Sequence, residues 1–308
     1  MLRILVLGSA AGGGFPQWNS NDAASRRART GDPAARPRSQ SSIAVTADGK
    51  RWVLLNASPD LRQQISERPQ LHPLPDSARR SSPISAVVLT NADVDHTAGL
   101  LSLRERQMLA VYGHARVLDV LADNNIFTVL DGKFVARRPI ALDTPLELSD
   151  HSGRSLGITL LAFAVPGKVA LWLEDVSDIG ASPGDTIGLM LAAPGSRPFF
   201  YIPGCAALNP DVGSRLLGAA LVFFDGTLWR DDEMIVQGVG SKTGQRMGHM
   251  SCSGETGTMA AFASLNVDRK VFIHINNTNP LLLDDSPERA MAVRLGWEVA
   301  YDGMEIVL

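Results

Sequence analysis

The sequence predicts an α/β protein in which sheets pack against each other with helices on the outside. Short β-branched or aromatic runs, bounded by polar residues, glycine or proline, recur along the chain and indicate many buried strands. Fewer segments between them carry helical signals, which favours packed sheets with outer helices. The 308 residues are 45% hydrophobic and show neither an internal repeat nor an interdomain linker, so we expect one domain over residues 1–308.

The first elements surround a glycine-rich loop and a hairpin. The apolar run Ile4–Leu7 predicts a strand, and the glycines of Gly8–Gly14 behind it miss the G-x-G-x-x-G register of a dinucleotide site. Asp48-Gly49 predicts a hairpin turn between the next two strands. The elements predicted up to residue 89 are strands at Ile4–Leu7, Ser42–Thr46, Arg51–Leu55 and Ile84–Leu89 and a helix at Leu61–Ser66.

The rest of the chain alternates helical signals with short apolar runs. A helix is expected soon after the strand that ends at Leu89, which gives a unit of strand, polar loop and helix. Helices are predicted from Thr97 and at Val117–Val129, Asp211–Leu217, Gly254–Ser264 and Pro287–Leu295. Strands are predicted at Ala141–Leu148, Ile158–Ala164, Val169–Leu173, Ile187–Leu191, Phe199–Ile202, Ala219–Phe224, Val271–Ile273, Trp297–Tyr301 and Glu305–Leu308.

Composition and charge argue against several classes of protein. The formal net charge of -3 disfavours a nucleic-acid-binding protein, because affinity for phosphate backbones depends on a basic surface. The chain shows neither a signal peptide nor the apolar window of about 20 residues that a membrane span needs, so we expect a soluble cytoplasmic protein. Cys205 and Cys252 form neither a C-x-x-C motif nor a disulfide framework.

A polar, flexible loop is predicted over about residues 19–40. This stretch is rich in serine, alanine and proline, and we interpret it as a solvated loop. An alternative is that its arginines steer an anion over a site. Those arginines are Arg26, Arg27, Arg29, Arg36 and Arg38.

Potential metal ligands follow three predicted strands at the point where each strand ends. Asp93, Asp95 and His96 come directly after the first of these strands, Asp225 ends the second and His274 follows the third. Two carboxylates this close together are costly unless they are solvated, protonated or bound to a cation. Two of these residues, taken alone, also have a purely structural interpretation: His274 as a core histidine and Asp225 as a turn-forming aspartate. Together they predict a metal site.

The glycine-rich segment Gly238–Met250 adds a second group of candidate site residues. Its Gly240–Thr243 resembles a phosphate loop, but Ser241 stands where the Walker spacing requires a glycine. We therefore expect a flexible loop that presents His249 to the site, with Lys242 and Arg246 available for an anionic substrate. Mixed histidine and carboxylate ligands suit Zn²⁺, Fe²⁺ or Mn²⁺, and two histidines with one carboxylate would fit non-haem iron and oxygen chemistry.

The segment Thr90–His96 resembles the metallo-β-lactamase motif T-H-x-H-x-D-H, with Asn91 and Asp93 at the two histidine positions and with Asp95 and His96 matching. Further strings identify the chain as a member of the coenzyme PQQ biosynthesis protein B family, a resemblance that runs from Ile4 to the C-terminus. These strings are Leu5–Asn19, Asn56–Asp60, Asp225–Trp229 and His274–Pro280.

This resemblance implies an αββα sandwich of the metallo-β-lactamase type with the site at one edge of the paired sheets. His274 would take the place of the superfamily's late histidine, and Asp225 and His249 would lie in loops that face the metal. Cys205 stands where the superfamily often has a metal-bridging aspartate, which argues against a complete dinuclear hydrolase centre. Many members have a C-x-C-x-x-C cluster near residues 18–25 that would hold a structural zinc. This chain has no cysteine there, so we expect that zinc to be absent.

The resemblance also implies a role in pyrroloquinoline quinone (PQQ) biosynthesis. The function we favour is hydroxylation or oxidation of the tyrosine of the PQQ precursor peptide, or of an intermediate derived from its tyrosine and glutamate. Fe(II) is the favoured metal and Zn(II) the alternative, held by His96, His274 and either Asp95 or Asp93. Asp225 and His249 would be an acid–base pair or further ligands.

Two other functions stay open at this stage. The first is a soluble protein that binds PQQ or its precursor and takes part in transport to the periplasm. The second is a metal-dependent hydrolase, which the altered motif disfavours. A homodimer is compatible with the sequence, and neither nucleic acid nor a membrane is an expected partner.

Overall fold

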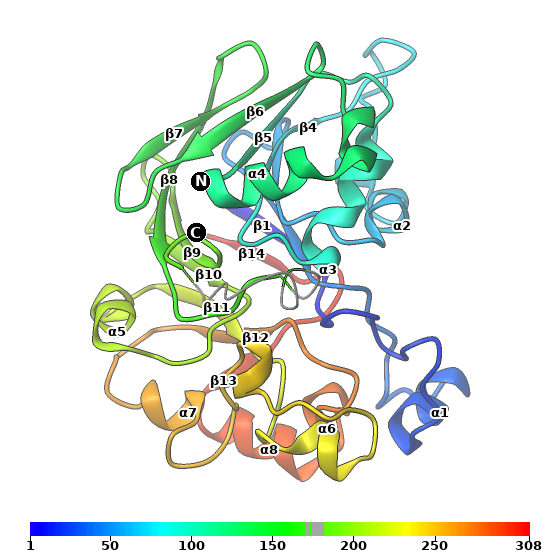
Figure 1. The fold of residues 1–308 in the computed structure, drawn as a ribbon, viewed down its shortest axis with the longest axis vertical. Helices are drawn as coiled ribbons and strands as arrows, with labels where there is room; N and C mark the ends of the chain where they lie inside the picture. The colour runs from blue at the N-terminus through cyan, green and yellow to red at the C-terminus, as the bar shows by residue number, and fades with distance from the viewer. Residues whose placement is uncertain (171–172, 174–181) are drawn as a thin grey trace.

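The computed structural model describes residues 1–170, 173 and 182–308, and within them the chain forms two seven-stranded sheets (Figure 1). Their strand orders are β14-β1-β2-β3-β4-β5-β6 and β13-β12-β11-β10-β9-β8-β7. The first sheet comprises β1 (Arg3–Gly8), β2 (Ser42–Thr46), β3 (Trp52–Leu55), β4 (Ile84–Val88), β5 (Leu109–His114), β6 (Val135–Ile140) and β14 (Glu305–Val307). The second comprises β7 (Leu146–Ser149), β8 (Ser155–Ala164), β9 (Ile187–Ala192), β10 (Phe199–Ile202), β11 (Leu221–Asp225), β12 (Lys270–Ile273) and β13 (Trp297–Val299).

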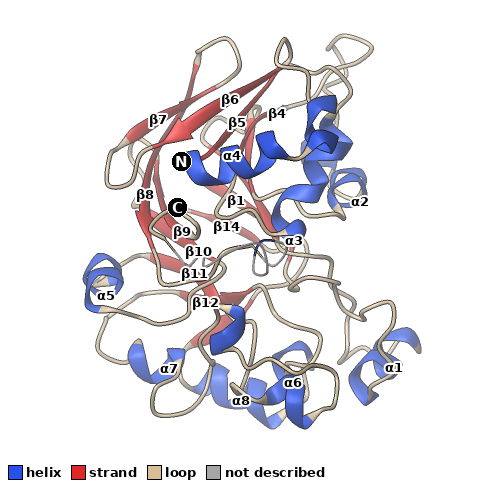
Figure 2. Cartoon of the chain, in the orientation of Figure 1, coloured by secondary structure: helices blue, strands red, loops and turns tan. Residues whose placement is uncertain are grey.

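Short helices cover the outer sides of the paired sheets (Figure 2). The α-helices are α1 (Ala23–Arg29), α2 (Leu61–Ser66), α3 (Val94–Thr97), α4 (Ala115–Asp123), α5 (Pro210–Leu216), α6 (Glu233–Val236), α7 (Thr258–Ala261) and α8 (Pro287–Arg294). Single 3₁₀ turns occur at Pro69–Leu71, Ala98–Leu103, Asn125–Val129, Gln245–Met247 and Pro280–Leu282. No helix among the described residues is both long enough and apolar enough to cross a membrane.

Three apolar cores hold these layers together, one between the two sheets and one between each sheet and its outer helices. Alternate residues of a strand point to opposite faces of its sheet, so Ile4 and Val6 of β1 pack between the two sheets while Leu5 and Leu7 face the side of α2 and α4. On the other sheet, Phe224 of β11 packs with residues of α5, α7 and α8. This layering confirms the predicted αββα sandwich.

The directions of the strands bring the candidate ligands to one edge of the sandwich. Strands β3 to β6 are parallel in the first sheet, and β10 to β13 are parallel in the second. Parallel strands place their carboxyl ends at one edge of a sheet, where ligands commonly bind. The chain segments that follow β4, β11 and β12 meet at this edge.

Several predicted elements differ from the structure in length or position. The helix predicted over Val117–Val129 is two elements, because Asn124 has an extended backbone with φ -100° and ψ 108° and ends α4. Strand β6 was not predicted, because its two central arginines hide the apolar pattern. One of them, Arg138, stacks on the Tyr112 ring at 5.6 Å and donates to Ser149.

The strand predicted over Val169–Leu173 falls partly outside the described residues, which exclude Leu171 and Trp172. Val169 and Ala170 are described and do not lie in a strand. The backbone N–H of Leu173 donates to the carbonyl of Ala170 at 2.8 Å. This part of the prediction was wrong for Val169 and Ala170.

The segment predicted as a flexible loop over about residues 19–40 contains helix α1 and is tied to the body of the protein. Arg27 forms ion pairs with Asp32 at 2.6 Å and with Asp285 at 2.7 Å. Arg38 is only 5% exposed and donates to the carbonyl of Ala300 at 3.1 Å. Both side chains serve to anchor the segment, so the structure supports neither a freely solvated loop nor anion steering by these two arginines.

Gly99 lets the chain behind α3 approach the end of β3, and its replacement is the first change we predict. A Cβ at Gly99 would lie 2.1 Å from the carbonyl oxygen of Ser58, so Gly99→Ala forces backbone to move. We expect the free energy of unfolding to fall by about 3 kcal/mol in urea titrations, as for severe overpacking. Gly132→Ala is the matched control, because a Cβ there meets nothing within 4 Å. Equal stability of the two variants would contradict the prediction.

Candidate metal centre

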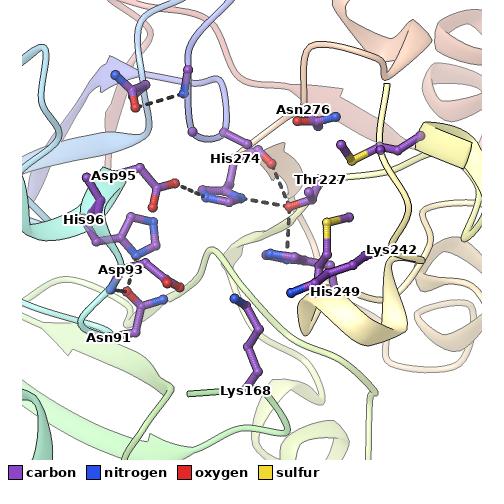
Figure 3. A pocket seen from close by; sticks show the side chains of 18 of the residues that line it. Asn91, Asp93, Asp95, His96, Lys168, Thr227, Lys242, His249, His274 and Asn276 are labelled. Atoms are coloured by element: carbon purple, nitrogen blue, oxygen red, sulfur yellow. Dashed lines mark hydrogen bonds and ion pairs between the residues drawn. The ribbon is translucent and has the colours of Figure 1, made fainter. Parts of the chain in front are cut away.

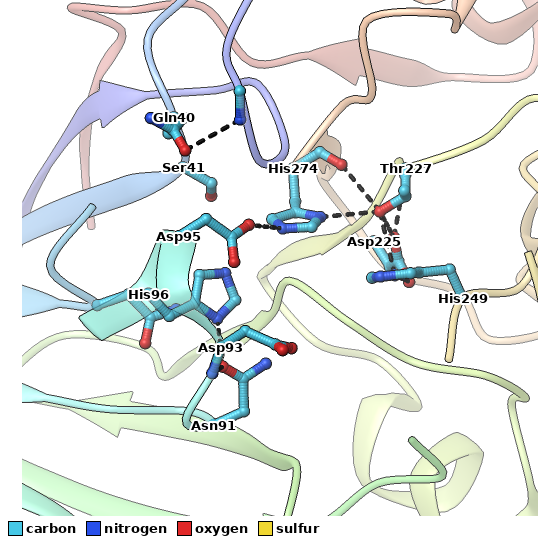
Figure 4. Close-up of polar contacts among 12 residues, drawn as sticks. Gln40, Ser41, Asn91, Asp93, Asp95, His96, Asp225, Thr227, His249 and His274 are labelled. Carbon is cyan, nitrogen blue, oxygen red and sulfur yellow. Dashed lines mark hydrogen bonds and ion pairs between the residues drawn. The ribbon is translucent and has the colours of Figure 1, made fainter. Parts of the chain in front are cut away.

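Three strand ends supply the polar side chains of the site. Asp95 and His96 lie in α3, directly after the turn that follows β4. Asp225 is the last residue of β11, and His274 follows β12 with a left-handed backbone at φ 59°. Non-glycine residues seldom adopt this conformation, and it persists where the surrounding structure holds it. Here it directs the His274 ring toward Asp95 (Figure 4).

Asp95, His96 and His274 form what we call the first donor cluster, whose ligand atoms all lie within 4.8 Å of one another. His274 Nε2 contacts Asp95 Oδ2 at 3.0 Å, and the His96 and His274 rings meet edge to face at 5.1 Å. His96 Nε2 is buried and has no hydrogen-bond partner among the residues that the structure describes. Buried polar atoms are rarely left unpaired, so this nitrogen is an available ligand atom.

Asn91 determines which nitrogen of His96 is available. Its Oδ1 accepts from the backbone N–H of Asp93 at 3.1 Å and lies 2.7 Å from His96 Nδ1. Because the same oxygen accepts both contacts, Nδ1 carries the proton and Nε2 keeps its lone pair. Asn91 therefore orients a ligand histidine, as the outer partners of metal-bound histidines do.

Asp225, His249 and His274 form a second donor cluster, which shares His274 with the first. Here the side chains already bond to one another. Asp225 Oδ2 lies 2.7 Å from His249 Nδ1 and accepts from the backbone N–H of Cys205 at 2.9 Å. Asp225 Oδ1 accepts from the Thr227 hydroxyl at 2.6 Å, and Thr227 Oγ1 lies 2.8 Å from His274 Nδ1 (Figure 4).

These contacts fix the roles of the histidine nitrogens. The Thr227 hydroxyl has one proton, which it donates to Asp225, so His274 Nδ1–H donates to Thr227. His274 Nε2 donates to Asp95 when it is protonated and becomes a ligand atom when that proton leaves. His249 Nδ1–H donates to Asp225, which leaves its Nε2 as an acceptor. We conclude that the second cluster is a hydrogen-bonded relay beside the first.

Burial and charge shift the pKa values of all three residues of the first cluster. Burial lowers the pKa of His96 to about 4, so its imidazole is neutral at pH 7. Burial raises the pKa of Asp95, but the charge of His96 and the hydrogen bond from His274 outweigh it and hold that pKa well below its ordinary value. For His274, burial lowers the pKa, but the hydrogen bond to Asp95 and the charges of the nearby carboxylates raise it by more, for a net increase. A metal ion that binds His274 Nε2 therefore displaces a proton from it.

The first cluster lies on the wall of a cavity of about 560 Å³, a size suited to a small molecule or a short peptide segment. Figure 3 shows Asp95 and His96 on one side of this space, His249 on the other and His274 between them, with Lys168 and Lys242 pointing into it. The cavity is lined by Ala11, Gly12, Gly13, Gln40, Asn91, Asp93, Val94, Asp95, His96, Lys168, Thr227, Met234, Gly240, Ser241, Lys242, Met247, His249, His274 and Asn276.

The predicted site residues fall into four groups, one of which is the pair Asp225 and His249 in the second cluster. Asp95, His96 and His274 share the first cluster with ligand geometry, whereas Asp93 and Lys242 line the same cavity outside both clusters. Arg246 does not line the cavity and its side chain is exposed, because it lies in the 3₁₀ turn Gln245–Met247. The structure thus separates Arg246 from the proposed anion site.

Two further residues matter that the sequence did not single out. Thr227 lies within the conspicuous string after β11, but nothing in the sequence showed that its hydroxyl would join Asp225 to His274. Lys168 lies in a glycine-containing turn after β8 and enters the cavity only through tertiary structure. Cys205 is a poor ligand, because burial together with the charge of Asp225 raises the pKa of its thiol to about 12.

Comparison with known proteins assigns the family. Residues 51–275 match the beta-lactamase superfamily domain. The chain is 56% identical to coenzyme PQQ synthesis protein B of Gluconacetobacter diazotrophicus over 308 residues, covering 99% of both chains. This chain belongs to the PqqB family. A PqqB of Xanthomonas axonopodis pv. citri is 55% identical over the full length of both chains.

Solved structures agree with this assignment. The zinc-bound PqqB of Methylobacterium extorquens has a TM-score of 0.93 and 50% identity, covering 99% of this chain and 100% of that chain. A diphosphatase of the PhnP family, with a TM-score of 0.68 and 18% identity, covers 99% of this chain and 96% of its own, and shares the fold alone. Family membership and fold are therefore as the sequence predicted.

The residues of this PqqB-family chain fit a divalent metal ion. The first cluster offers two imidazoles and a carboxylate, a donor set that binds Zn²⁺ and Fe²⁺. His96 Nε2 is the decisive atom, since it is buried, deprotonated and bonded to none of the described residues. His96, His274 and Asp95 would hold the ion.

Replacing Asn91 tests its role as the partner of a ligand histidine in this PqqB-family member. We expect Asn91→Ala to weaken metal binding by about 10- to 100-fold, because His96 loses the bond that fixes its tautomer and ring orientation. Competition with a chelator of known affinity measures the dissociation constant. Asn91→Asp keeps an acceptor for His96 Nδ1 and should lose less affinity. If Asn91→Ala binds metal as the unmodified protein does, Asn91 has no such role.

Proposed function

We propose that this protein acts in PQQ biosynthesis as a metal-dependent hydroxylase of the tyrosine ring of the PQQ precursor peptide, or of an intermediate derived from its tyrosine and glutamate. Family membership supports the pathway. The observation that carries the reaction is the first donor cluster, whose two histidines and one carboxylate are typical of non-haem Fe(II) oxygenases. A ferrous ion bound there would supply the activation of dioxygen. Zn(II) is the alternative metal.

The relay beside this cluster has the properties of a general base. Asp225 is fully buried and accepts from His249 Nδ1 at 2.7 Å, so the free nitrogen of His249 is Nε2. His249 lines the cavity (Figure 3), so a phenol bound there would lie within reach of this nitrogen. His249 would take the phenolic proton at Nε2, and the negative charge of Asp225 would stabilise the imidazolium that forms.

The overall reaction balances with an external reductant. One oxygen atom of O₂ enters a ring C–H bond to give a second hydroxyl, and the other leaves as water. That water takes up two protons and two electrons, which a two-electron reductant of the ascorbate type can supply. The protein itself then returns to its starting state after each turnover.

The test compares two metals in the same protein. We expect anaerobically purified protein loaded with Fe(II) to consume oxygen in the presence of ascorbate and a synthetic peptide that contains glutamate and tyrosine. Mass spectrometry should show one added oxygen atom on tyrosine. Zinc-loaded protein is the control and should leave the peptide unchanged.

Each rival function has its own result in this experiment. Iron-loaded protein that consumes no oxygen, while zinc-loaded protein cleaves a peptide or an ester, would sink the hydroxylase and favour a hydrolase. Protein that binds PQQ or the peptide but changes neither, with any metal, would favour a carrier. Both outcomes contradict the proposal.

A further inference from the structure

Two lysines enter the cavity from separate parts of the chain. Lys168 follows β8, and Lys242 belongs to the glycine-rich loop after α6. Both line the cavity that also exposes the first donor cluster. In Figure 3 their side chains extend toward the space between Asp93 and His249. A molecule that fills this cavity would therefore meet ammonium groups as well as the metal ligands.

The position of Lys168 is fixed by its neighbours. Gly248 has a left-handed backbone at φ 83°, and a Cβ at that residue would lie only 2.9 Å from Lys168 Cγ. The glycine therefore leaves room for the aliphatic part of the lysine one residue before His249. The Lys168 carbonyl also accepts from the Thr186 hydroxyl at 3.2 Å. These contacts set the backbone and the first carbons of the Lys168 side chain beside His249.

Part of the remaining cavity wall is apolar. Met234, Met247 and Val94 contribute flexible or branched side chains to it. Methionine adapts to the face or edge of an aromatic ring and makes favourable contacts with it. The lining thus combines a metal-binding side, an apolar wall and a cationic side.

We infer that Lys168 and Lys242 form a carboxylate-binding subsite that selects aromatic ligands carrying an acidic group, and that Lys168 is a specificity-determining residue. This inference rests on the proposed function, because the aromatic ring of the ligand is the phenol of the proposed substrate and the carboxylate is a second group on that molecule. The ring would lie along Met234 and Met247, and the carboxylate would pair with the ammonium groups. Lysine binds such an oxyanion as a point charge.

A pair of probes that differ only in charge tests the subsite. The probes are 3-(4-hydroxyphenyl)propionate and its neutral analogue 3-(4-hydroxyphenyl)propanol, titrated calorimetrically into zinc-loaded protein. We expect the acid to bind about 10-fold more tightly than the alcohol, as for a charge-assisted hydrogen bond. Lys168→Met should remove this preference and leave affinity for the alcohol and for zinc within about 2-fold. Lys168→Arg should retain most of the preference.

Lys133→Met is the matched control, since Lys133 is exposed in the turn before β6, at the opposite end of that sheet. It should bind both probes as the unmodified protein does. The inference is overturned if the unmodified protein shows no preference for the acid, if Lys168→Met keeps that preference, or if Lys168→Met weakens both probes equally. The probe titrations use zinc-loaded protein and need no oxygen chemistry. If the preference for the acid depends on Lys168 but the iron-loaded protein does not hydroxylate the peptide, the proposed function is contradicted and the subsite is still supported.

Discussion

His274→Ala is expected to abolish tight metal binding, because His274 is the residue that both donor clusters share. Loss of an outer partner such as Asn91 weakens metal binding by about 10- to 100-fold, and loss of a ligand histidine should weaken it by more. The change also leaves Asp95 buried without the histidine that contacts it at 3.0 Å. Metal content after dialysis and the dissociation constant from chelator competition measure the effect. Oxygen consumption should fall with metal content.

Single replacements in each cluster then show which one holds the ion. His96→Ala removes a ligand of the first cluster only, and His249→Gln removes a donor of the second only. If the first cluster is the metal site, His96→Ala loses metal and His249→Gln keeps it. His72→Ala is the control, since His72 is exposed and contacts only the backbone carbonyls of Ile65 and Ser66. Retention of metal by His274→Ala would contradict the site altogether.

The sequence predicted the layers of the fold because its strands carry a simple signal. Residues 4–8 of β1 and 221–224 of β11 are all apolar or small, as befits strands that are buried on both faces. Polar groups that directly follow such strands are easy to recognise, which is how Asp225 and His274 were found. Boundaries were harder where polar residues lie inside an element, as in β6 with its two central arginines.

The functional roles within the site depended on tertiary contacts that no local pattern contains. Asn91 looked like the loss of a metal ligand, yet its side chain lies 2.7 Å from His96 Nδ1 and fixes that histidine. Arg246 and Lys242 stand four positions apart, but one is exposed and the other lines the cavity. Lys168 reaches the same cavity because Gly248, 80 positions later, lies against it. Such pairs are set by packing between distant segments, which the sequence alone did not specify.

Asp225→Asn is expected to lower the turnover number by about 100- to 10,000-fold, the range for loss of a positioned acid–base group. Asp225 Oδ2 receives N–H groups from Cys205 and His249, and its other oxygen receives the N–H and the hydroxyl of Thr227. The amide of the variant has one acceptor oxygen and one NH₂ group. The NH₂ group must therefore face either Cys205 and His249 or Thr227. If it faces His249, Nδ1 of that histidine becomes an acceptor and Nε2 carries the proton, which removes the base.

The same change also measures whether Asp225 acts through charge or through metal binding. An amide that leaves a buried N–H without a partner should cost about 1–3 kcal/mol of unfolding free energy, so the variant is compared at a temperature where it is folded. If Asp225 and His249 form a relay, Asp225→Asn and His249→Gln should both keep the metal and lose turnover to a similar degree. The double variant should be no slower than either single variant, because the effects of residues that act as a unit are not additive. Loss of metal from both variants would instead make Asp225 and His249 ligands of a second ion and remove the argument for a base. Full turnover with Asp225→Asn would show that neither role is needed, and the phenolic proton would then have to leave by another path.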